Sequence, residues 1–463
     1  MKIILISLDT TRLDRLGCYG YPSPTSPYLD QIAAQGALWE RAYASDIPTE
    51  VAHTGVFTGR VGLSTGVVAH GSSLTQLAKG VPWLPALLRN QGFVTGAVDN
   101  LYQLKEWFAR GYRYYVNSSA PGQRWIDGRT VNDLAKAWIG EHKGEDFFLF
   151  LHYWDPHTPY LPPPGHVNRF YAPDRNPKDP DNKSMERAYN HRAYPFFKHH
   201  HYDLLGGITD SAYMNALYDA ELRYLDDLLQ ELDEFLAQQG IVEETFLILF
   251  GDHGESLDEH DIFWDHCGLY EPTVHVPMIM RWPNRIPPGR RIPGLVQQVD
   301  LLPTILEAAG CSLPGGLDGK SLWPSIRGET EGTQDRIYLS ECAWQASRGV
   351  VTRDFKFIRT VDSGPFVRPR RELYDLRVDG REIQNIAESS AQVADELERL
   401  LDEWVDRGLA GRPDPMGIVL REQGLPFRRR ISEILQQVGM TWEQWSENPD
   451  RAAFDEAQRR HAR

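Results

Sequence analysis

The chain has 463 residues, 41% of them hydrophobic and 24% charged, which suits two or three globular units and excludes a disordered chain or a small disulfide scaffold. Lys and Arg number 49 and Asp and Glu 64, so the net charge of −15 argues against nucleic acid or an anionic membrane surface as a partner. A small anionic substrate would therefore need a local positive site, such as a metal ion. The four cysteines form no CxxC pair, and no apolar run is long enough for a membrane span or a signal peptide, so we expect a cytoplasmic protein.

The first predicted element is a buried parallel strand over residues 2–8, an apolar run that ends at Asp9. Further elements follow in chain order: helices around residues 26–36 and after Pro48, and strands over 92–100, 147–155 and 245–254. This alternation predicts an α/β fold with a doubly wound sheet. Ligands bind at the carboxyl ends of such strands, so Asp9 lies where a site is expected.

The middle of the chain holds a long segment, 156–213, that is rich in Pro, Asn, His and Arg and shows little periodicity. We interpret it as a surface insertion near the site, and the run His199–His201 within it as solvated loop residues outside the site. The next segment, 218–239, carries leucines at three- and four-residue steps, which predicts an amphipathic helix that Gly240 ends.

After about residue 328 the pattern changes to short strands followed by a helix around 391–408, which predicts a smaller α+β subdomain. We therefore expect a catalytic domain over 1–330 and a C-terminal subdomain with a helical tail over 331–463. The charged tail from Asp414 is expected to pack on the surface or on a neighbouring subunit. The sequence is therefore compatible with both a monomer and a homo-oligomer.

Two strand ends carry metal-ligand side chains, namely Asp9 and the pair Asp252-His253 within Gly251-Asp252-His253-Gly254-Glu255. Carboxylates and an imidazole on one rim are ligands for a divalent cation, although an Asp at a strand end is as often a cap or a turn residue. Thr49 follows Pro48 at a turn-to-helix junction. Its hydroxyl either caps that helix or, bound to a metal, serves as a nucleophile.

Taken together, these segments resemble the sulfatase branch of the alkaline phosphatase superfamily, in the family's order and over most of the chain. The matching pieces are ISLDTTRLDRLGCYGY, the PT(x)8TGR segment, LHYWDPHTPYLPP, YDAELRYLD, LFGDHGE, DHCGLYEPTVHVPMI and, near the end, KFIRT with ELYDLRVDGREIQNIA. The resemblance implies an alkaline-phosphatase-like α/β fold, a mostly parallel sheet sandwiched by helices, with a smaller C-terminal α+β subdomain.

The resemblance also implies roles for individual residues. The metal cluster matches Asp9, Thr49, Asp252 and His253, with Thr49 at the nucleophile position, and the catalytic set is Thr49, His157 and His266. A second metal site, as in the two-metal members, would use Asp155, His157 and His266, although Asp155 is equally a turn residue before Pro156. The residues expected to contact substrate are His53, Asn100, Tyr102 and Lys105.

The nucleophile segment departs from the family. Sulfatases carry Cys or Ser, oxidised to formylglycine within C-x-P-x-R, whereas this chain has Thr49, Val51 and His53. Thr cannot form that aldehyde, so a transferred sulfate cannot leave by elimination and water must attack the transferred centre itself, which phosphorus permits readily. The T-x-x-x-H spacing resembles the superfamily's phosphodiesterases. We therefore predict a metal-dependent hydrolase of phosphate or phosphonate esters.

Three alternatives stay open: a sulfuric ester hydrolase that works without formylglycine, a phosphoryl-group transferase, and a catalytically silent binding protein. The metal is also open. Thr10 stands where sulfatases carry a second Asp, which weakens a calcium site, so zinc or manganese is expected as one or two ions, with calcium as the alternative.

Overall fold

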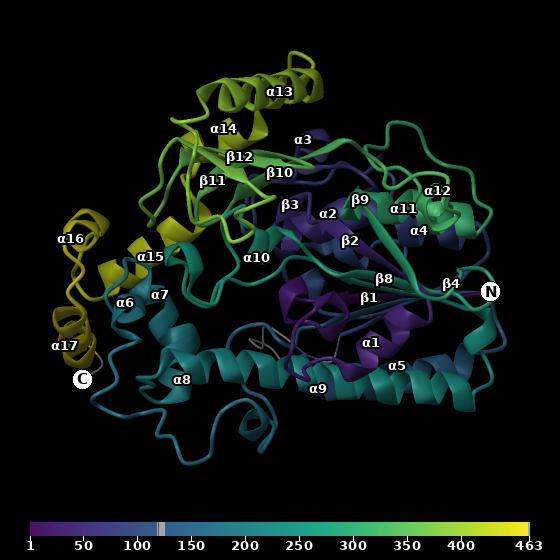
Figure 1. The fold of residues 1–463 in the computed structure, drawn as a ribbon, viewed down its shortest axis with the longest axis horizontal. Coiled ribbons are helices and arrows are strands. Elements are labelled where there is room, and N and C mark those ends of the chain that lie inside the picture. The colour runs from purple at the N-terminus through teal and green to yellow at the C-terminus, as the bar shows by residue number, and fades with distance from the viewer. Residues whose placement is uncertain (118, 120–125, 462–463) are drawn as a thin grey trace.

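The computed structural model describes residues 1–117, 119 and 126–461, and its centre is an eight-stranded sheet (Figure 1). In spatial order its strands are β5 (Tyr114–Val116), β4 (Val94–Val98), β6 (Phe147–Tyr153), β1 (Lys2–Leu8), β7 (Thr245–Gly251), β8 (Met278–Arg281), β2 (Ala37–Tyr43) and β9 (Arg290–Gln297). Only β8 runs antiparallel to its neighbours among these described strands. The predicted mostly parallel sheet is confirmed.

Strand β1 lies at the centre of the sheet because its seven residues are all buried, as a parallel strand covered on both faces requires. Alternate side chains enter two different cores: Ile4 and Ile6 pack on one face, and Ile3 and Leu5 on the other. The register pairs Ser7 with His152 on β6 and with Phe250 on β7. The three strands therefore end at one edge, where Asp9 and Asp252 follow.

Helices cover both faces of this sheet (Figure 1). One layer contains α1 (Pro27–Ala34), α5 (Gly128–His142) and α9 (Ser211–Gln238), and the other contains α2 (Thr49–Thr58), α4 (Leu84–Asn90), α11 (Leu301–Ala308) and α12 (Trp323–Ile326). Helix α9 begins seven residues before the predicted start, because Asp210 caps it by accepting a hydrogen bond from Ala212 N. It ends at Gln238, just before Gly240, whose φ is 69°.

A second, five-stranded sheet follows in the order β13 (Arg371–Asp375), β12 (Phe355–Asp362), β11 (Ala346–Thr352), β10 (Arg336–Cys342) and β3 (Asp46–Ile47). Helix α13 (Ala391–Leu409) packs on it through Leu397 and Leu401. The strand β3 belongs to the segment that leads into α2, so the smaller sheet is joined to the nucleophile segment. The domain boundary at residue 330 stays a prediction.

The insertion 156–213 is built of short helices that pack against the C-terminal tail. The insertion contains α6 (Glu186–Tyr189), α7 (Tyr194–Phe197), the π-helical turn η6 (Lys198–Tyr202) and α8 (Asp203–Leu205), and the tail contains α14 (Pro415–Glu422), α15 (Pro426–Gln437), α16 (Trp442–Glu447) and α17 (Arg451–His461). Trp445 Nε1 donates a hydrogen bond of 2.7 Å to Arg192 O, and Lys198 Nζ lies 2.9 Å from Asp455. The tail therefore holds the insertion in place.

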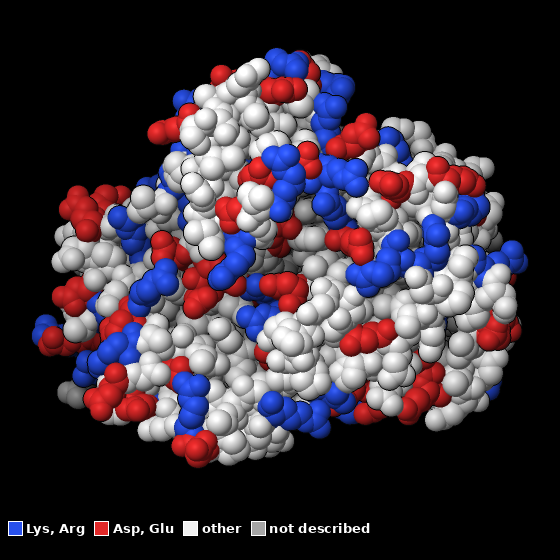
Figure 2. All heavy atoms as spheres, in the orientation of Figure 1, with Lys and Arg blue, Asp and Glu red and all other residues white. Residues whose placement is uncertain are grey.

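The remaining short elements are α3 (Gly62–Thr65), α10 (Glu271–Val274) and the 3-10 turns η1 (Leu13–Arg15), η2 (Gly17–Tyr19), η3 (Leu101–Gln103), η4 (Glu106–Ala109), η5 (Val167–Arg169), η7 (Val242–Glu244), η8 (Glu259–Asp261) and η9 (Gln298–Asp300). In the described part of the chain, no helix is both long enough and apolar enough to cross a membrane. Acidic and basic side chains are interspersed over the face shown in Figure 2. The net negative charge therefore forms no single-sign field on that face.

Candidate metal centre and active site

The carboxyl edge of the sheet brings three buried side chains into one cluster. Ligand atoms of Asp9, Asp252 and His253 all lie within 4.8 Å of one another, and each residue is fully buried. His253 Nε2 is 3.3 Å from Asp252 Oδ2 and 3.9 Å from Asp9 Oδ1. The strand register explains the meeting, since β1 and β7 are neighbours that end side by side.

The cluster fits a divalent cation because one oxygen of each carboxylate lacks a hydrogen-bond partner among the described residues. Within the described chain, neither Asp9 Oδ1 nor Asp252 Oδ2 has a hydrogen-bond partner, although both atoms are buried. Burial and the neighbouring Asp9 carboxylate raise the pKa of Asp252 well above its usual range. Unpaired buried carboxylates are costly unless a cation balances them, so these residues have the arrangement of metal ligands.

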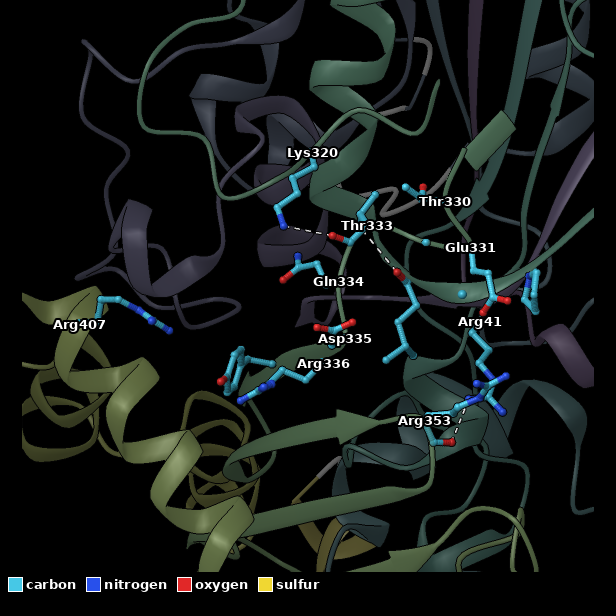
Figure 3. A pocket seen from close by; sticks show the side chains of 15 residues that line it. Arg41, Lys320, Thr330, Glu331, Thr333, Gln334, Asp335, Arg336, Arg353 and Arg407 are labelled. Atoms are coloured by element: carbon cyan, nitrogen blue, oxygen red, sulfur yellow. Dashed lines mark hydrogen bonds between the residues drawn. The ribbon is translucent and has the colours of Figure 1, made fainter. Parts of the chain in front are cut away.

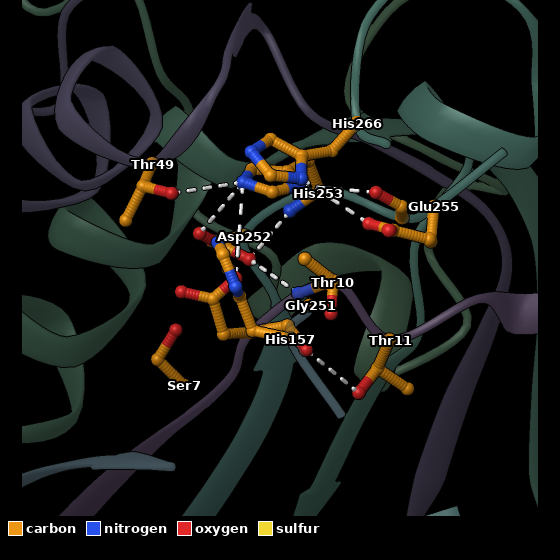
Figure 4. Close-up of polar contacts among 12 residues, drawn as sticks. Ser7, Thr10, Thr11, Thr49, His157, Gly251, Asp252, His253, Glu255 and His266 are labelled. Carbon is orange, nitrogen blue, oxygen red and sulfur yellow. Dashed lines mark hydrogen bonds and ion pairs between the residues drawn. The ribbon is translucent and has the colours of Figure 1, made fainter. Parts of the chain in front are cut away.

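Thr49 is the first residue of α2, and its side chain turns toward this cluster (Figure 4). No side-chain cap is found at this helix start, and Thr49 Oγ1 instead lies 3.0 Å from His253 Nε2. His253 Nδ1 faces the Gly254 carbonyl at 3.0 Å, which can only accept, so Nδ1 carries the proton and Nε2 accepts from the Thr49 hydroxyl. Burial lowers the pKa of His253 well below its usual range, which keeps the imidazole neutral.

His53 was predicted to contact substrate, but it lies behind Thr49. It is not among the residues that line the cavity beside Thr49. Its Nδ1 donates a hydrogen bond of 2.8 Å to the Thr49 carbonyl, and its Nε2 is 2.8 Å from Ser7 Oγ. The side chain is fully buried, and burial lowers its pKa to about 4. His53 therefore positions the nucleophile segment rather than the substrate.

His152, which the sequence analysis missed, forms a buried link between two carboxylates. Its Nε2 lies 3.0 Å from Asp9 Oδ2, and its Nδ1 lies 3.1 Å from Asp99 Oδ1. Both carboxylates accept, so both nitrogens carry protons. Burial opposes this charge, yet the two carboxylates raise the pKa of His152 to about 10. The sequence does contain one indication of this role, since His152 is a single histidine within the otherwise apolar run of β6.

His157 and His266 lie across from Thr49, with their ring centroids 4.9 Å apart. His266 Nδ1 lies 3.2 Å from Glu255 Oε2, and the two side chains appear together in Figure 4. Although burial lowers the pKa of His266, Asp265 and Glu255 raise it to about 10, so its imidazole is charged. His157 donates from Nδ1 to the Thr158 carbonyl, and burial lowers its pKa. The pair thus combines a charged donor with a neutral imidazole.

Three predicted site residues are not brought to this cluster. Asp155 Oδ2 accepts a hydrogen bond of 3.0 Å from Gly128 N at the start of α5, and none of the possible metal-binding groups among the described residues includes Asp155. Lys105 donates to Ser72 O at 2.6 Å and lies 3.7 Å from Glu50. Tyr102 is 51% exposed. These three side chains serve the local packing or face solvent instead.

A cavity of about 300 Å³ opens onto the reacting groups, and Thr49, Asn100, His157 and His266 line it. His200 and His201 line it too, which corrects their placement outside the site; the side chain of His199 lies outside the described part of the structure. A larger hollow of about 830 Å³ lies between β9 and α13, with arginines, Glu331 and Asp335 around it (Figure 3). None of Thr49, His157 and His266 lines it, so the chemistry belongs to the smaller cavity.

Two carboxylates and an imidazole that could hold a cation, with a helix-start hydroxyl beside them, lie at the edge of a parallel sheet, where such folds place their ligands. The chain belongs to the sulfatase family: the model described as "Sulfatase" matches residues 2–311, and that described as "N-sulphoglucosamine sulphohydrolase, C-terminal" matches residues 258–407. The enzymes of this family act on ester bonds and depend on a metal ion.

Named relatives support this assignment. An N-acetylglucosamine-6-O-sulfatase of Bacteroides thetaiotaomicron is 22% identical, over 90% of this chain and 88% of its own length. Arylsulfatase K of Rattus norvegicus is 30% identical, over 53% of this chain and 45% of its own. The phosphonate monoester hydrolase structure from Agrobacterium radiobacter has a TM-score of 0.72 at 19% identity, covering 88% of this chain and 96% of that one. This likeness shows the alkaline-phosphatase-like fold.

Proposed function

We propose that the protein is a metal-dependent hydrolase of sulfuric esters of small anionic molecules, with Thr49 as its nucleophile. The observation that carries the proposal is the position of Thr49 Oγ1, 3.0 Å from His253 Nε2 at the edge where Asp9 and Asp252 meet. The named relatives are sulfatases, and this favours sulfuric over phosphoric esters, reversing the order that the sequence argument gave.

Asp9, Asp252, His253 and Thr49 would hold the cation, and these oxygen and imidazole donors suit zinc or manganese better than calcium. Such an ion lowers the pKa of a coordinated hydroxyl and balances the charge of the ester group. Its partners within the chain are already oriented: His152 holds Asp9 Oδ2, and the Gly254 carbonyl fixes the tautomer of His253.

The chain's own groups then account for both halves of the reaction. Thr49 Oγ1, as the alkoxide that remains once its hydroxyl proton has passed to solvent water, attacks sulfur, and the bond from sulfur to the leaving oxygen breaks as that oxygen takes a proton from His266. Water next attacks sulfur, returns a proton to His266, and displaces Thr49 Oγ1 with release of hydrogen sulfate. His157 faces the same cavity and contacts the anionic group.

A second candidate, hydrolysis of phosphoric or phosphonic esters, is favoured by Thr49 itself. Thr cannot be oxidised to formylglycine, so both halves of the reaction are in-line displacements, and phosphorus undergoes these more readily than sulfur. The phosphonate monoester hydrolases have the same fold, with TM-scores of 0.72 and 0.71. A transferase differs only in the acceptor, because an alcohol then takes the place of water.

The test is hydrolysis of an aryl sulfate and of the matched bis-aryl phosphate by metal-stripped protein, before and after zinc, manganese or calcium is returned. We expect the sulfate to be cleaved faster, only with metal, and not by Thr49→Ala. Faster cleavage of the phosphate would move the assignment to the second candidate. Undiminished activity of Thr49→Ala would refute the role of this residue.

A further inference from the structure

We propose that the cavity beside Thr49 binds a single six-membered ring that carries a second anionic group, and that Arg430 and His201 select it. The proposal rests on the proposed function for which bond is cleaved. The ring and charge preference, however, follows from the part of the cavity that lies away from the metal cluster.

The size and lining of the cavity favour one ring. Its volume of about 300 Å³ is at the lower end of the range of ligand pockets. Thr49, His157 and His266 line it beside His253 and take the ester group. The remainder must hold the alcohol half of the substrate, which leaves space for a ring and its substituents but not for a long chain.

The wall of this remainder is aromatic. Trp344 and Phe427 stack with ring centroids 4.6 Å apart, and Phe196 packs edge-on against both, at 5.1 and 5.4 Å. Trp344 is 1% exposed, so its position is fixed by packing. Flat rings, either aryl groups or the apolar face of a pyranose, pack well against such a surface.

Arg430 supplies a positive charge at this wall. It lies one helical turn after Phe427 on α15, and its guanidinium carbon is 5.5 Å from the centroid of the Phe196 ring. No carboxylate of the described residues forms an ion pair with it, whereas neighbouring Arg429 pairs with Glu433 at 3.8 Å. Burial lowers the pKa of Arg430, and Glu433 is close enough to raise it but forms no ion pair with it among the described residues. A guanidinium that lines a cavity and keeps its N–H donors out of a close ion pair favours an anionic substituent on the ring.

His201 adds a second polar contact. It is 1% exposed and lines the cavity, and in the described structure neither of its ring nitrogens has a hydrogen-bond partner. Burial lowers its pKa to about 3, so it is neutral, with one donor and one acceptor. A buried imidazole without partners is costly, and a hydroxyl on the bound ring would satisfy it.

The wall comes from two segments. Phe427 and Arg430 lie beyond residue 407, where the second family match ends, and Phe196 and His201 belong to the insertion, inside the first match. The tail helix α15 packs directly on α7 of the insertion. Two segments outside the sheet therefore form the selective part of the site.

The test measures binding of alcohol products by calorimetry to the full-length protein, with no turnover required. The aryl arm compares 4-hydroxybenzoate with 4-hydroxybenzamide, and the pyranose arm compares D-glucuronate with D-glucose. In one of the two pairs, we expect the anionic compound to bind more tightly than its neutral counterpart. The pair that shows this difference identifies the preferred ring as aryl or pyranose. Arg430→Gln should weaken that binding about ten-fold and leave the neutral member unchanged. Equal binding of both members in both arms would overturn the proposal.

Arg429→Gln is the matched control, because it removes the same charge one residue away and should change nothing. His201→Leu keeps the buried volume and should weaken both members of the preferred pair about five-fold. Equal effects of the Arg429 and Arg430 variants would contradict the proposal. Product binding with the expected pattern in a protein that cleaves no ester would overturn the proposed function alone.

Discussion

Replacing Glu255 by Gln should lower the pH above which the enzyme loses activity. Glu255 is fully buried, and its Oε2 lies 3.2 Å from His266 Nδ1. Burial lowers the pKa of His266, but Asp265, Glu255 and Asp9 raise it from 6.5 to about 10. Removing one opposite charge at this distance lowers a pKa by about one to three pH units, or about 1.4 to 4 kcal/mol. His266 must be protonated to assist the leaving oxygen, so the alkaline limb of the profile should move down by that amount.

The assay is kcat/KM against pH for an aryl ester with a poor leaving group, measured for the wild type and Glu255→Gln. Tyr160→Phe is the control, because Tyr160 donates to the other Glu255 oxygen at 2.7 Å and its removal leaves the carboxylate charge in place. Only the Glu255 variant should move the alkaline limb. An unchanged limb in Glu255→Gln, or equal movements in both variants, would refute the role assigned to His266.

Four further outcomes are expected. Thr49→Ala should reduce turnover at least 1,000-fold, on the order of the loss of an essential nucleophile, with little change in melting temperature. Chelation should remove activity and lower the melting temperature, and zinc or manganese should restore both. Leu232→Ala on α9, at a side chain 2% exposed, should cost about 2 to 5 kcal/mol of unfolding free energy in urea. Burial raises the pKa of Asp226 to about 7, so the folded state keeps a proton that the unfolded state loses, and stability falls as pH rises from about 4 to 7. Asp226→Asn should therefore gain stability relative to wild type at pH 8 and not at pH 4, as followed by urea unfolding.

The fold was predictable where the spacing of hydrophobic residues indicates directly which side chains are buried. The continuous apolar runs of β1, β6 and β7 predicted central parallel strands, and the leucine spacing of α9 predicted its helix. The antiparallel direction of β8 was not predictable, since four buried residues carry no sign of their direction. Nor was the pairing of β3 with β10, which joins segments almost 300 residues apart.

The candidate metal cluster was predictable because strand ends in a parallel sheet meet at one edge. Asp9, Asp252 and His253 follow two such strands, β1 and β7. The prediction required only that these two strands be neighbours in the sheet. His152 was missed because it lies inside the apolar run of β6, whereas its partners Asp9 and Asp99 follow the ends of β1 and β4. Lys105 was assigned to substrate on the family resemblance, and nothing in the sequence relates it to its buried partner Glu50.

The structure of the insertion and of the tail could not be predicted from sequence patterns, for a different reason. Their helices are short, and each segment is held in place by contacts with the other, such as the hydrogen bond from Trp445 to Arg192. A run of histidines with little periodicity indicated a solvated loop, yet His201 is buried, packs its ring against Tyr160 and lines the cavity. Such burial is set by what the ring packs against and not by the run itself.

The central claim is that Thr49 receives the transferred group, and trapping that adduct tests it most directly. The metal-loaded enzyme is mixed with an aryl sulfate, quenched in acid during turnover and digested, and the peptide with Thr49 is analysed by mass spectrometry. We predict a mass increase of one SO₃ group on Thr49, absent from the wild type after the substrate is exhausted and from Thr49→Ala at all times. Turnover without any adduct, together with activity in Thr49→Ala, would contradict the account.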